Sequence, residues 1–347
     1  MEESAPVSPR PFSEDLLTRS RISGVGFHVP PRVVTNADLE KLMDTTDEWI
    51  VERTGIRERR YVDPGVGVTD LALEAARKTL AAAGRRAADV DFIVFASITR
   101  DYAFPGCGPL LQERLGLPTI GALDVHNACS GFLYGLAVAD SFVRLGQHRC
   151  VLVVGAEVQS TGLDFTSAGR DMAVLFGDGA GAVLVEPGEE DGRGLLAWAL
   201  HAEGAHAREL WAEAPTSRVP GRITPAMLAE GRHFPRMNGR VVFKHAATRF
   251  TEVIHEVLDK AGHTLDEVRL IVPHQANKRI SDAVAQRLGV PAAKVFQNID
   301  RYGNTTAASV PIALAEAHEQ GRIEPGDLVV LAAFGGGFAW AAAALHW

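Results

Sequence analysis

The stretch LAAAGRRAADVDFIV, residues 80–94, returns later in the chain as LDKAGHTLDEVRLIV, residues 258–272. The two stretches align without a gap at a constant offset of 178 residues. Each has the pattern of a helix end, an Ala-Gly pair that stops the helix, a short turn, and a β-prone run suited to a buried strand. This repetition predicts an α/β protein in which one unit occurs twice.

Further landmarks repeat in the same order. RLGLP at 114–118 matches RLGVP at 287–291, and each is expected to end a helix. VLVV at 151–154 matches LVVL at 328–331 as a later buried strand. Helix–glycine–strand cassettes also recur by chance in α/β proteins, but the preserved order of several landmarks favours duplication.

We therefore divide the chain into an N-terminal tail (1–19), a first half carrying a candidate nucleophile (20–190) and a second half (191–347). Residues 187–236 are rich in Gly, Pro, Glu and Arg and show little periodicity. They are expected to form surface connections.

The composition limits the class of protein. With 347 residues, 46% of them hydrophobic, the chain can bury a large core. A net charge of -8 argues against a nucleic-acid binder, and no apolar run reaches the ~18–20 residues that cross a bilayer. Three cysteines are too few for a disulfide framework, and the 12 histidines show no paired ligand spacing, so no metal site is expected. A reducing, cytoplasmic location fits best.

Cys129 is the first candidate for chemistry. It lies in HNACSGF, residues 126–132, directly before a helical pattern, which places its thiol at a helix N-terminus. The helix dipole and the free N–H groups there stabilise a thiolate and can bind the oxyanion of a thioester adduct. An inert buried thiol is the alternative from this segment alone, and Cys107 and Cys150 are assigned to that class.

Two polar residues of the second half complete the set of candidates. His274, in PHQAN, follows a predicted buried strand, and α/β sheets place ligands at the carboxyl ends of strands. By the offset it corresponds to Ala96, so the two copies differ there. Asn304, in YGNTTAAS, opens the next helix at a position that mirrors Cys129. A backbone-bonded histidine and a turn or N-cap asparagine are the simpler interpretations of each residue alone, whereas the conjunction favours catalysis.

The motifs around these residues resemble the signature of β-ketoacyl-acyl-carrier-protein synthase III, a family of the thiolase superfamily. The resemblance covers about residues 20–347. Its motifs are ACSGF around Cys129, PHQAN around His274, YGNTTAASVP around Asn304, FGGGFAW at 334–340, TNADLEKLMDTTDEWIVERTGIRERR at 35–60 and FGDGAGAVLV at 176–185.

The resemblance implies a thiolase fold, in which two similar halves form a five-layer αβαβα protomer, and a homodimer with active sites near its interface. It implies an acyltransferase with Cys129, His274 and Asn304 as the catalytic triad. The cysteine takes an acyl group from a thioester primer, and a malonyl thioester then loses CO2 to give an enolate equivalent that attacks it. His274 and Asn304 would donate hydrogen bonds to the enolate oxygen, and the N–H groups of Cys129 and Gly336 would hold the tetrahedral oxyanion.

The resemblance also implies how substrates bind. No cofactor is held permanently; the substrates are coenzyme A or phosphopantetheine thioesters, namely acyl-CoA or acyl-ACP (acyl carrier protein) and malonyl-ACP. Planar and guanidinium groups suit a purine and its phosphates, although an ordinary core Trp and solvated Arg residues are the alternatives. The implied contacts are Trp49, Arg53 and Arg170 for the nucleotide, Gly239 and Asn277 for the pantetheine tunnel, Phe104 for the acyl pocket, and Lys244, Arg279 and Arg287 for docking of the acidic carrier protein.

Several positions depart from the family pattern. Ala341 stands where Gly is usual, Arg240 replaces Asn, and His126 and Asn127 precede Ala-Cys in place of small residues. These departures put the primer or the second substrate in doubt more than the catalytic step.

Two other functions stay open on the sequence alone. A relative in secondary metabolism would join two carrier-bound chains or transfer an acyl group to an alcohol or amine. A non-catalytic acyl-binding scaffold is less favoured, because it has no need for three reactive side chains. A degradative thiolase is disfavoured because the loop FGGGF carries no second cysteine.

Overall fold

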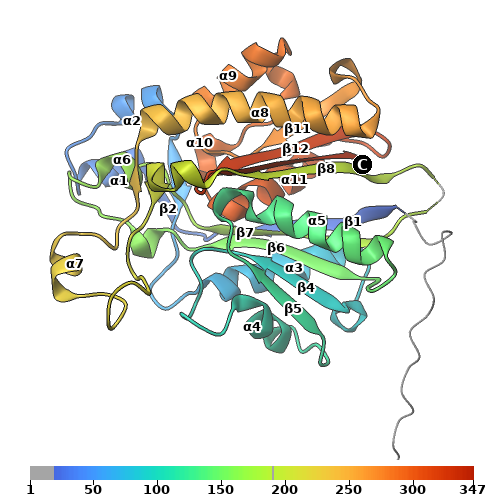
Figure 1. Ribbon diagram of the computed structural model, residues 1–347, viewed down its shortest axis with the longest axis horizontal. Coiled ribbons are helices and arrows are strands. Elements are labelled where there is room, and N and C mark those ends of the chain that lie inside the picture. The colour runs from blue at the N-terminus through green and yellow to red at the C-terminus, as the bar shows by residue number, and fades with distance from the viewer. Residues whose placement is uncertain (1–18, 190) are drawn as a thin grey trace, which may run out of the picture.

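The computed structural model describes residues 19–189 and 191–347, and it contains two large sheets, one from each half of the chain (Figure 1). The predicted tail, residues 1–19, lies outside the described residues apart from Arg19. In the part of the chain that is described, no helix is both long and apolar enough to cross a membrane.

The first sheet has five strands in the order β1-β7-β6-β4-β5. β4 is parallel to both β5 and β6, and β7 runs antiparallel to both β6 and β1. The strands are β1 (Ser20–His28), β7 (Gly179–Pro187), β6 (Val151–Glu157), β4 (Phe92–Ala96) and β5 (Gly121–Val125).

The second sheet repeats this order with four strands, β8-β13-β12-β11. β11 is parallel to β12, and β13 is antiparallel to both β12 and β8. A single parallel bridge between Ile271 and Val295 stands where β5 lies in the first sheet. The strands are β8 (Gly194–Ala202), β13 (Ala339–His346), β12 (Leu328–Gly335) and β11 (Val268–Pro273). The equal order and direction confirm the duplication that the repeated stretches predict.

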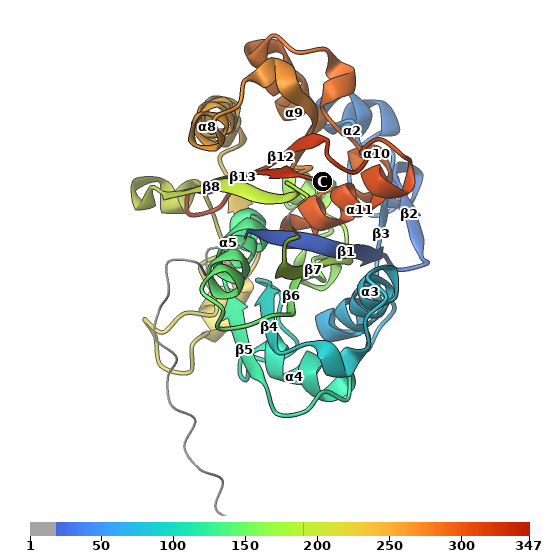
Figure 2. The same cartoon turned by 90° about the vertical axis from the view of Figure 1, so that its right-hand side faces the viewer.

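Helices separate and cover the two sheets, which gives five layers (Figure 2). The central layer is α5 (Gly131–Arg144) and α11 (Ser309–Glu319), whose apolar residues share one core with the inner faces of both sheets. α3 (Val68–Ala82) and α4 (Cys107–Arg114) cover the first sheet, and α8 (Gly239–Ala261) and α9 (Lys278–Leu288) cover the second. The predicted αβαβα fold is confirmed.

Shorter elements connect these layers. They are β2 (Val33–Thr35), α1 (Asn36–Glu40), α2 (Asp47–Thr54), β3 (Glu58–Arg60), α6 (Arg170–Ala173), β9 (Leu210–Trp211), α7 (Pro225–Ala229), β10 (Arg236–Met237) and α10 (Ile299–Tyr302).

The predicted helix stops are confirmed by backbone geometry. α8 and α9 end directly before Gly262 and Gly289, whose φ values of 74° and 69° lie in the left-handed region. Gly84 and Gly116, just beyond α3 and α4, have φ values of 63° and 65°. A residue without Cβ enters this region without a steric penalty, so each glycine turns the chain toward the following strand.

The expectation that residues 187–236 only form surface connections is wrong for β8. This segment, GLLAWALHA, lacks the β-branched residues that mark strands, and it is held by pairing with β13 along its length. The side chains of Leu195 and Ala199 on this strand are buried. Tertiary pairing therefore overrides its weak local preference.

The central helical layer makes a testable prediction for stability. Leu314 on α11 is fully buried between the sheets, and removal of such a side chain costs about 2–5 kcal/mol. We expect Leu314→Ala to lower the free energy of unfolding by this amount in guanidinium titrations. Leu228→Ala on α7, where the side chain is 49% exposed, is the control and should change it by less than about 0.5 kcal/mol. An equally small effect of both substitutions would contradict the layer assignment.

Candidate active site

Cys129, His274 and Asn304 line one cavity of about 590 Å³. They are 6%, 1% and 6% exposed, so all three side chains are almost shielded from bulk water. The residues follow β5, β11 and α10 respectively. The fold thus brings together the three side chains that the sequence analysis singled out.

The backbone turn before α5 positions Cys129. Ala128 has a positive φ of 44° and begins the 3₁₀ turn Ala128–Ser130, which leads directly into the helix. Such a φ is uncommon for a residue with a side chain. Thr306, 178 residues later, has a φ of 50° and begins the equivalent turn. In this register the counterpart of Cys129 is Ala307, and the counterpart of Asn304 is His126. The prediction that Asn304 mirrors Cys129 is therefore wrong by three residues.

The end of β12 packs tightly against the cysteine. A Cβ added to Gly335 would lie 2.6 Å from the Cβ of Cys129 and 2.9 Å from its Sγ. Ser130 Oγ donates to the carbonyl of Ala339, 2.8 Å away, and holds the turn to β13. Only glycine therefore fits at position 335. Because β12 lies so close to the cysteine, the backbone N–H of Gly336 reaches the sulfur of Cys129.

The electrostatic environment of Cys129 differs from the sequence expectation. Burial, with a smaller contribution from the Glu157 carboxyl, raises the pKa of its thiol to about 12. The backbone N–H groups of Cys129 and Gly336 lower that pKa, but their effect is smaller. The expected thiolate is therefore wrong for the free protein, because desolvation outweighs the helix terminus. The two N–H groups do meet at the sulfur.

His274 is a neutral and unpaired imidazole. Burial lowers its pKa to about 3, so the ring carries no charge at neutral pH. Its backbone N–H donates to Ala332 at 2.7 Å, but among the described residues neither ring nitrogen has a hydrogen-bond partner. A buried imidazole with both nitrogens free has one donor and one acceptor available to a ligand.

Asn304 is fixed so that its amide can donate. Its Oδ1 accepts the N–H of Thr306 at 2.9 Å. Its backbone N–H donates to the carbonyl of Leu175 at 2.8 Å, and its backbone carbonyl accepts the N–H of Gly177 at 3.0 Å. Since the carbonyl side of the amide is occupied, the Nδ2 group is the part left to serve the cavity.

The outer part of the cavity is basic. Arg53, Arg240 and Arg279 line it, and Asp171 is the one acidic residue of the lining within the described chain. The Arg53 and Arg170 guanidinium carbons lie 4.9 and 4.4 Å from the centroid of the Trp49 ring. This arrangement gathers an aromatic ring and positive charge, both of which suit a nucleotide.

Gly239 and Asn277 also line the cavity, but the Asn277 side chain is committed to structure. Its Oδ1 caps α9 through the N–H of Arg279 at 2.9 Å, and its Nδ2 donates to the carbonyl of Arg53 at 3.0 Å. Asn277 therefore shapes the wall of the cavity. Lys244 and Arg287 are exposed on α8 and α9 outside the lining, whereas Arg279 reaches it.

The assignment of Phe104 to the acyl pocket is not supported within one chain. Its side chain is 81% exposed in the loop between β4 and α4, and it does not line the cavity. The apolar lining instead includes residues that were not predicted from the sequence, among them Leu210, Val242, Ala246, Phe250 and Phe334. Three of these recur at helical spacing along one face of α8, a pattern that was available in the sequence.

A buried cysteine, a neutral histidine and an oriented carboxamide in one cavity of a duplicated αβαβα protomer define a condensing enzyme of the thiolase superfamily. Residues 123–204 match the family profile for 3-oxoacyl-[acyl-carrier-protein (ACP)] synthase III, and residues 258–347 match the profile for its C-terminal part. The chain belongs to the β-ketoacyl-ACP synthase III family.

Individual relatives agree over nearly the whole chain. The β-ketoacyl-ACP synthase III of Roseiflexus castenholzii is 47% identical over 94% of this chain and 97% of its own. The crystal structure of 3-oxoacyl-ACP synthase III from Aquifex aeolicus is 43% identical and superimposes with a TM-score of 0.87, covering 94% of this chain and 100% of that one. The priming β-ketosynthase of the R1128 polyketide pathway is 34% identical with a TM-score of 0.88, covering 95% and 96%.

Glu157 is a buried carboxyl that the sequence analysis did not identify. It ends β6, is fully buried, and accepts hydrogen bonds from Thr99 Oγ1 at 2.5 Å and from Ser97 Oγ and the Ile98 N–H at 3.2 Å. Burial raises its pKa to about 7, although these hydrogen bonds act in the opposite direction. An acidic residue at a strand end is usually exposed, so the sequence carried no signal for it.

The raised pKa of Glu157 predicts a pH dependence of stability. The folded state binds this proton more tightly than the unfolded chain, whose carboxyl titrates near 4.5, so stability falls as pH rises from about 4.5 to about 7. Glu157→Gln removes the titration. We expect the stability of the wild type relative to this variant to decrease by up to about 3 kcal/mol between pH 5 and pH 8, measured by denaturant unfolding. Parallel pH profiles for the two proteins would contradict the assignment.

Proposed function

We propose that this protein catalyses the decarboxylative condensation of an acyl thioester primer with a malonyl thioester, with Cys129, His274 and Asn304 as its catalytic residues. The observation that carries the proposal is one cavity lined by three groups: a cysteine whose sulfur meets two backbone N–H groups, an imidazole without a hydrogen-bond partner among the described residues, and an oriented amide. The first and second halves, 20–190 and 191–347, supply the nucleophile and the other two side chains respectively.

The first half-reaction forms an acyl-cysteine. Because the thiol of Cys129 is protonated in the free protein, its proton must leave as the sulfur attacks the thioester carbonyl. The neutral imidazole of His274 is the base that shares the cavity. The N–H groups of Cys129 and Gly336 hold the oxyanion of the tetrahedral adduct, and the proton passes to the leaving thiol.

The second half-reaction makes the carbon–carbon bond. Loss of CO2 from a malonyl thioester leaves an enolate whose oxygen carries negative charge. A neutral His274 and the Nδ2 group of Asn304 each donate one hydrogen bond to that oxygen. The enolate carbon then attacks the acyl carbonyl, and the sulfur of Cys129 departs with the C–S electron pair to release the β-ketoacyl product. The cysteine thiolate takes up a proton from water, which restores the resting thiol.

The basic outer cavity supports coenzyme A or phosphopantetheine thioesters as substrates and no permanently bound cofactor. Trp49 would stack on an adenine ring, with Arg53 and Arg170 near its phosphates, and Gly239 and Asn277 would border the pantetheine arm. An acidic acyl carrier protein would dock on the exposed basic residues Lys244, Arg279 and Arg287, and deliver acyl or malonyl groups.

We also propose a homodimer. β5 is the edge strand of the first sheet, and its Leu123 is 38% exposed. Tyr102 and Phe104, 60% and 81% exposed, add apolar surface in the preceding loop. An open strand edge beside exposed aromatic side chains is a surface that proteins normally cover, and a second copy of the chain would cover it.

The similarity to a priming ketosynthase of a polyketide pathway supports one alternative, a condensation that begins a secondary metabolite. In that case the reaction is unchanged and the primer differs. Transfer of an acyl group to an alcohol or amine would leave the Asn304 donor without a developing enolate, so it explains less of the site.

A panel of primers tests the nucleophile and its acyl specificity together. We expect intact-mass spectrometry to show one acyl group added to the wild type by a preferred straight or branched acyl-CoA, and none added to Cys129→Ala. Cys150→Ala, which removes another buried thiol, is the matched control and should be acylated normally. With malonyl-ACP, the acylated enzyme should release CO2 and a β-keto product. Acylation of Cys129→Ala, or an ester or amide product, would overturn the proposal.

A further inference from the structure

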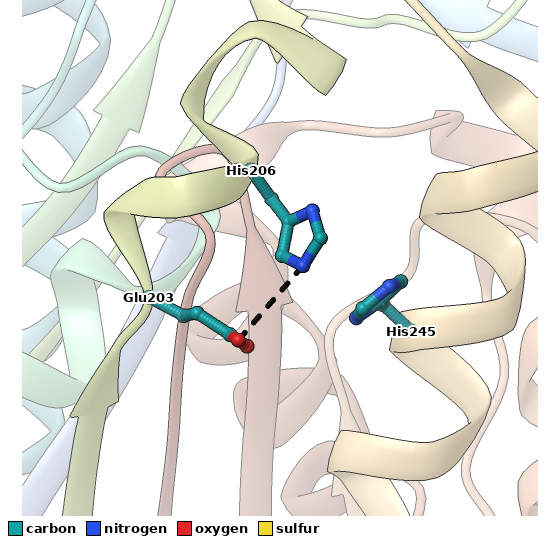
Figure 3. A group of neighbouring side chains, drawn as sticks. All are labelled: Glu203, His206 and His245. Carbon is teal, nitrogen blue, oxygen red and sulfur yellow. Dashed lines mark ion pairs between the residues drawn. The ribbon is translucent and has the colours of Figure 1, made fainter.

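A second group of reactive side chains lies outside the catalytic cavity. Glu203, just after β8, His206 in the 3₁₀ segment Gly204–Glu209, and His245 on α8 point toward one another (Figure 3). One ligand atom from each lies within 4.8 Å of the other two. We propose that these three residues bind one divalent ion of the zinc class, such as Zn²⁺ or Co²⁺, with a fourth position left to water.

The geometry is close to that of a bound ion. Zinc bonds to nitrogen and oxygen of about 2.0–2.1 Å place tetrahedral ligand atoms about 3.4 Å apart. The Nε2 of His206 is 3.8 Å from Oε1 of Glu203, so this pair needs to close by only about 0.4 Å. No two ligand atoms of the group are more than 4.8 Å apart, so the widest pair would have to approach by at most about 1.4 Å, a shift that side-chain rotation can supply.

The two imidazoles are available as ligands. Within the described chain, neither ring forms a side-chain hydrogen bond, and the only ion-pair contact of His206 is the one with Glu203, a member of the same group. Their centroids are 4.3 Å apart.

Glu203 is already held in the orientation that a ligand needs. Its Oε2 accepts a hydrogen bond from Arg249 at 3.0 Å, and Arg249 is in turn bonded to Glu252 at 2.8 Å. This leaves Oε1 directed at His206. Ligating carboxylates are commonly fixed by such outer hydrogen bonds. Two imidazoles and one carboxylate with an open fourth position form a donor set that suits zinc or cobalt rather than magnesium, which prefers oxygen ligands.

The position gives the ion a structural consequence. Both histidine rings pack against Phe338, with centroids 5.3 Å from it, and the backbone of Glu203 bonds to that of Phe338 in both directions at 2.8 and 3.1 Å. Phe338 follows the glycine loop that contacts Cys129. An ion here would clamp the segment Gly204–Glu209 onto α8 directly beside that loop. The sequence predicted no metal site because the third ligand lies 39 residues beyond the second.

Metal titration of chelator-treated protein tests the site. We expect the wild type to bind about one equivalent of Zn²⁺, to show visible absorption of tetrahedral Co²⁺, and to gain thermal stability with Zn²⁺. His206→Ala and His245→Ala should each weaken binding at least about 10-fold and abolish the stabilisation. A cooperative unfolding transition without metal will show that each variant is folded.

Two control variants separate this site from other donors. His201→Ala removes a histidine of similar exposure that is paired with Glu256, and it should bind metal as the wild type does. Cys129→Ala removes the thiol of the catalytic cavity and should also retain the bound ion. Absence of binding at about 100 μM Zn²⁺, equal affinity in both site variants and the wild type, or loss of binding only in Cys129→Ala would each overturn the proposal.

Discussion

The contact between the glycine end of β12 and the turn that carries Cys129 is the constraint on which the site depends. A Cβ at position 335 would overlap the cysteine side chain, so the two halves of the duplicated fold can approach only because that residue is glycine. A similar close approach occurs at Ala307, the counterpart of Cys129, where a Cβ at Gly155 would lie 2.2 Å from the carbonyl oxygen of Ala307, although Gly155 and Gly335 are not equivalent positions. Of the two equivalent turn residues, Cys129 carries a thiol and Ala307 a methyl group. Duplication therefore supplied the framework, and divergence of single side chains supplied the chemistry.

The same close packing determines the protonation states. Because Cys129 and His274 are almost completely buried, both are held in their neutral forms, the thiol with a pKa of about 12 and the imidazole with a pKa of about 3. A neutral imidazole can accept the thiol proton and can later donate a hydrogen bond to an enolate oxygen. A permanent thiolate–imidazolium pair would leave no such acceptor. Burial thus keeps the thiol of Cys129 protonated in the free protein. It also keeps the imidazole of His274 neutral, so that the ring can act first as a proton acceptor and later as a hydrogen-bond donor.

Much of this account could be predicted from the sequence. The repeated stretches predicted a doubled α/β unit, the helix stops at glycine and the placement of His274 after a strand, because local patterns decide those features, whereas the layered fold came only from the family resemblance. It did not predict β8, which depends on pairing with β13, or Glu157, whose burial depends on layers far apart in the chain. The thiolate expectation failed for the same reason, since a helix terminus is a local signal and desolvation is a property of the whole fold. The group Glu203, His206 and His245 arises only in three dimensions, as does the exposure of Phe104.

The proposed chemistry rests on the claim that one cavity holds two separate oxygen sites, one formed by backbone N–H groups at Cys129 and one by the side chains of His274 and Asn304. Separate assays of the two half-reactions in Asn304→Ala distinguish these sites. We expect the rate of acyl-cysteine formation to stay within a few-fold of the wild type, whereas the release of CO2 from malonyl-ACP by the acylated enzyme should fall by about 10²–10³-fold, the usual effect of one lost oxyanion donor. Equal losses in both half-reactions, or an unchanged rate of CO2 release, would contradict the claim.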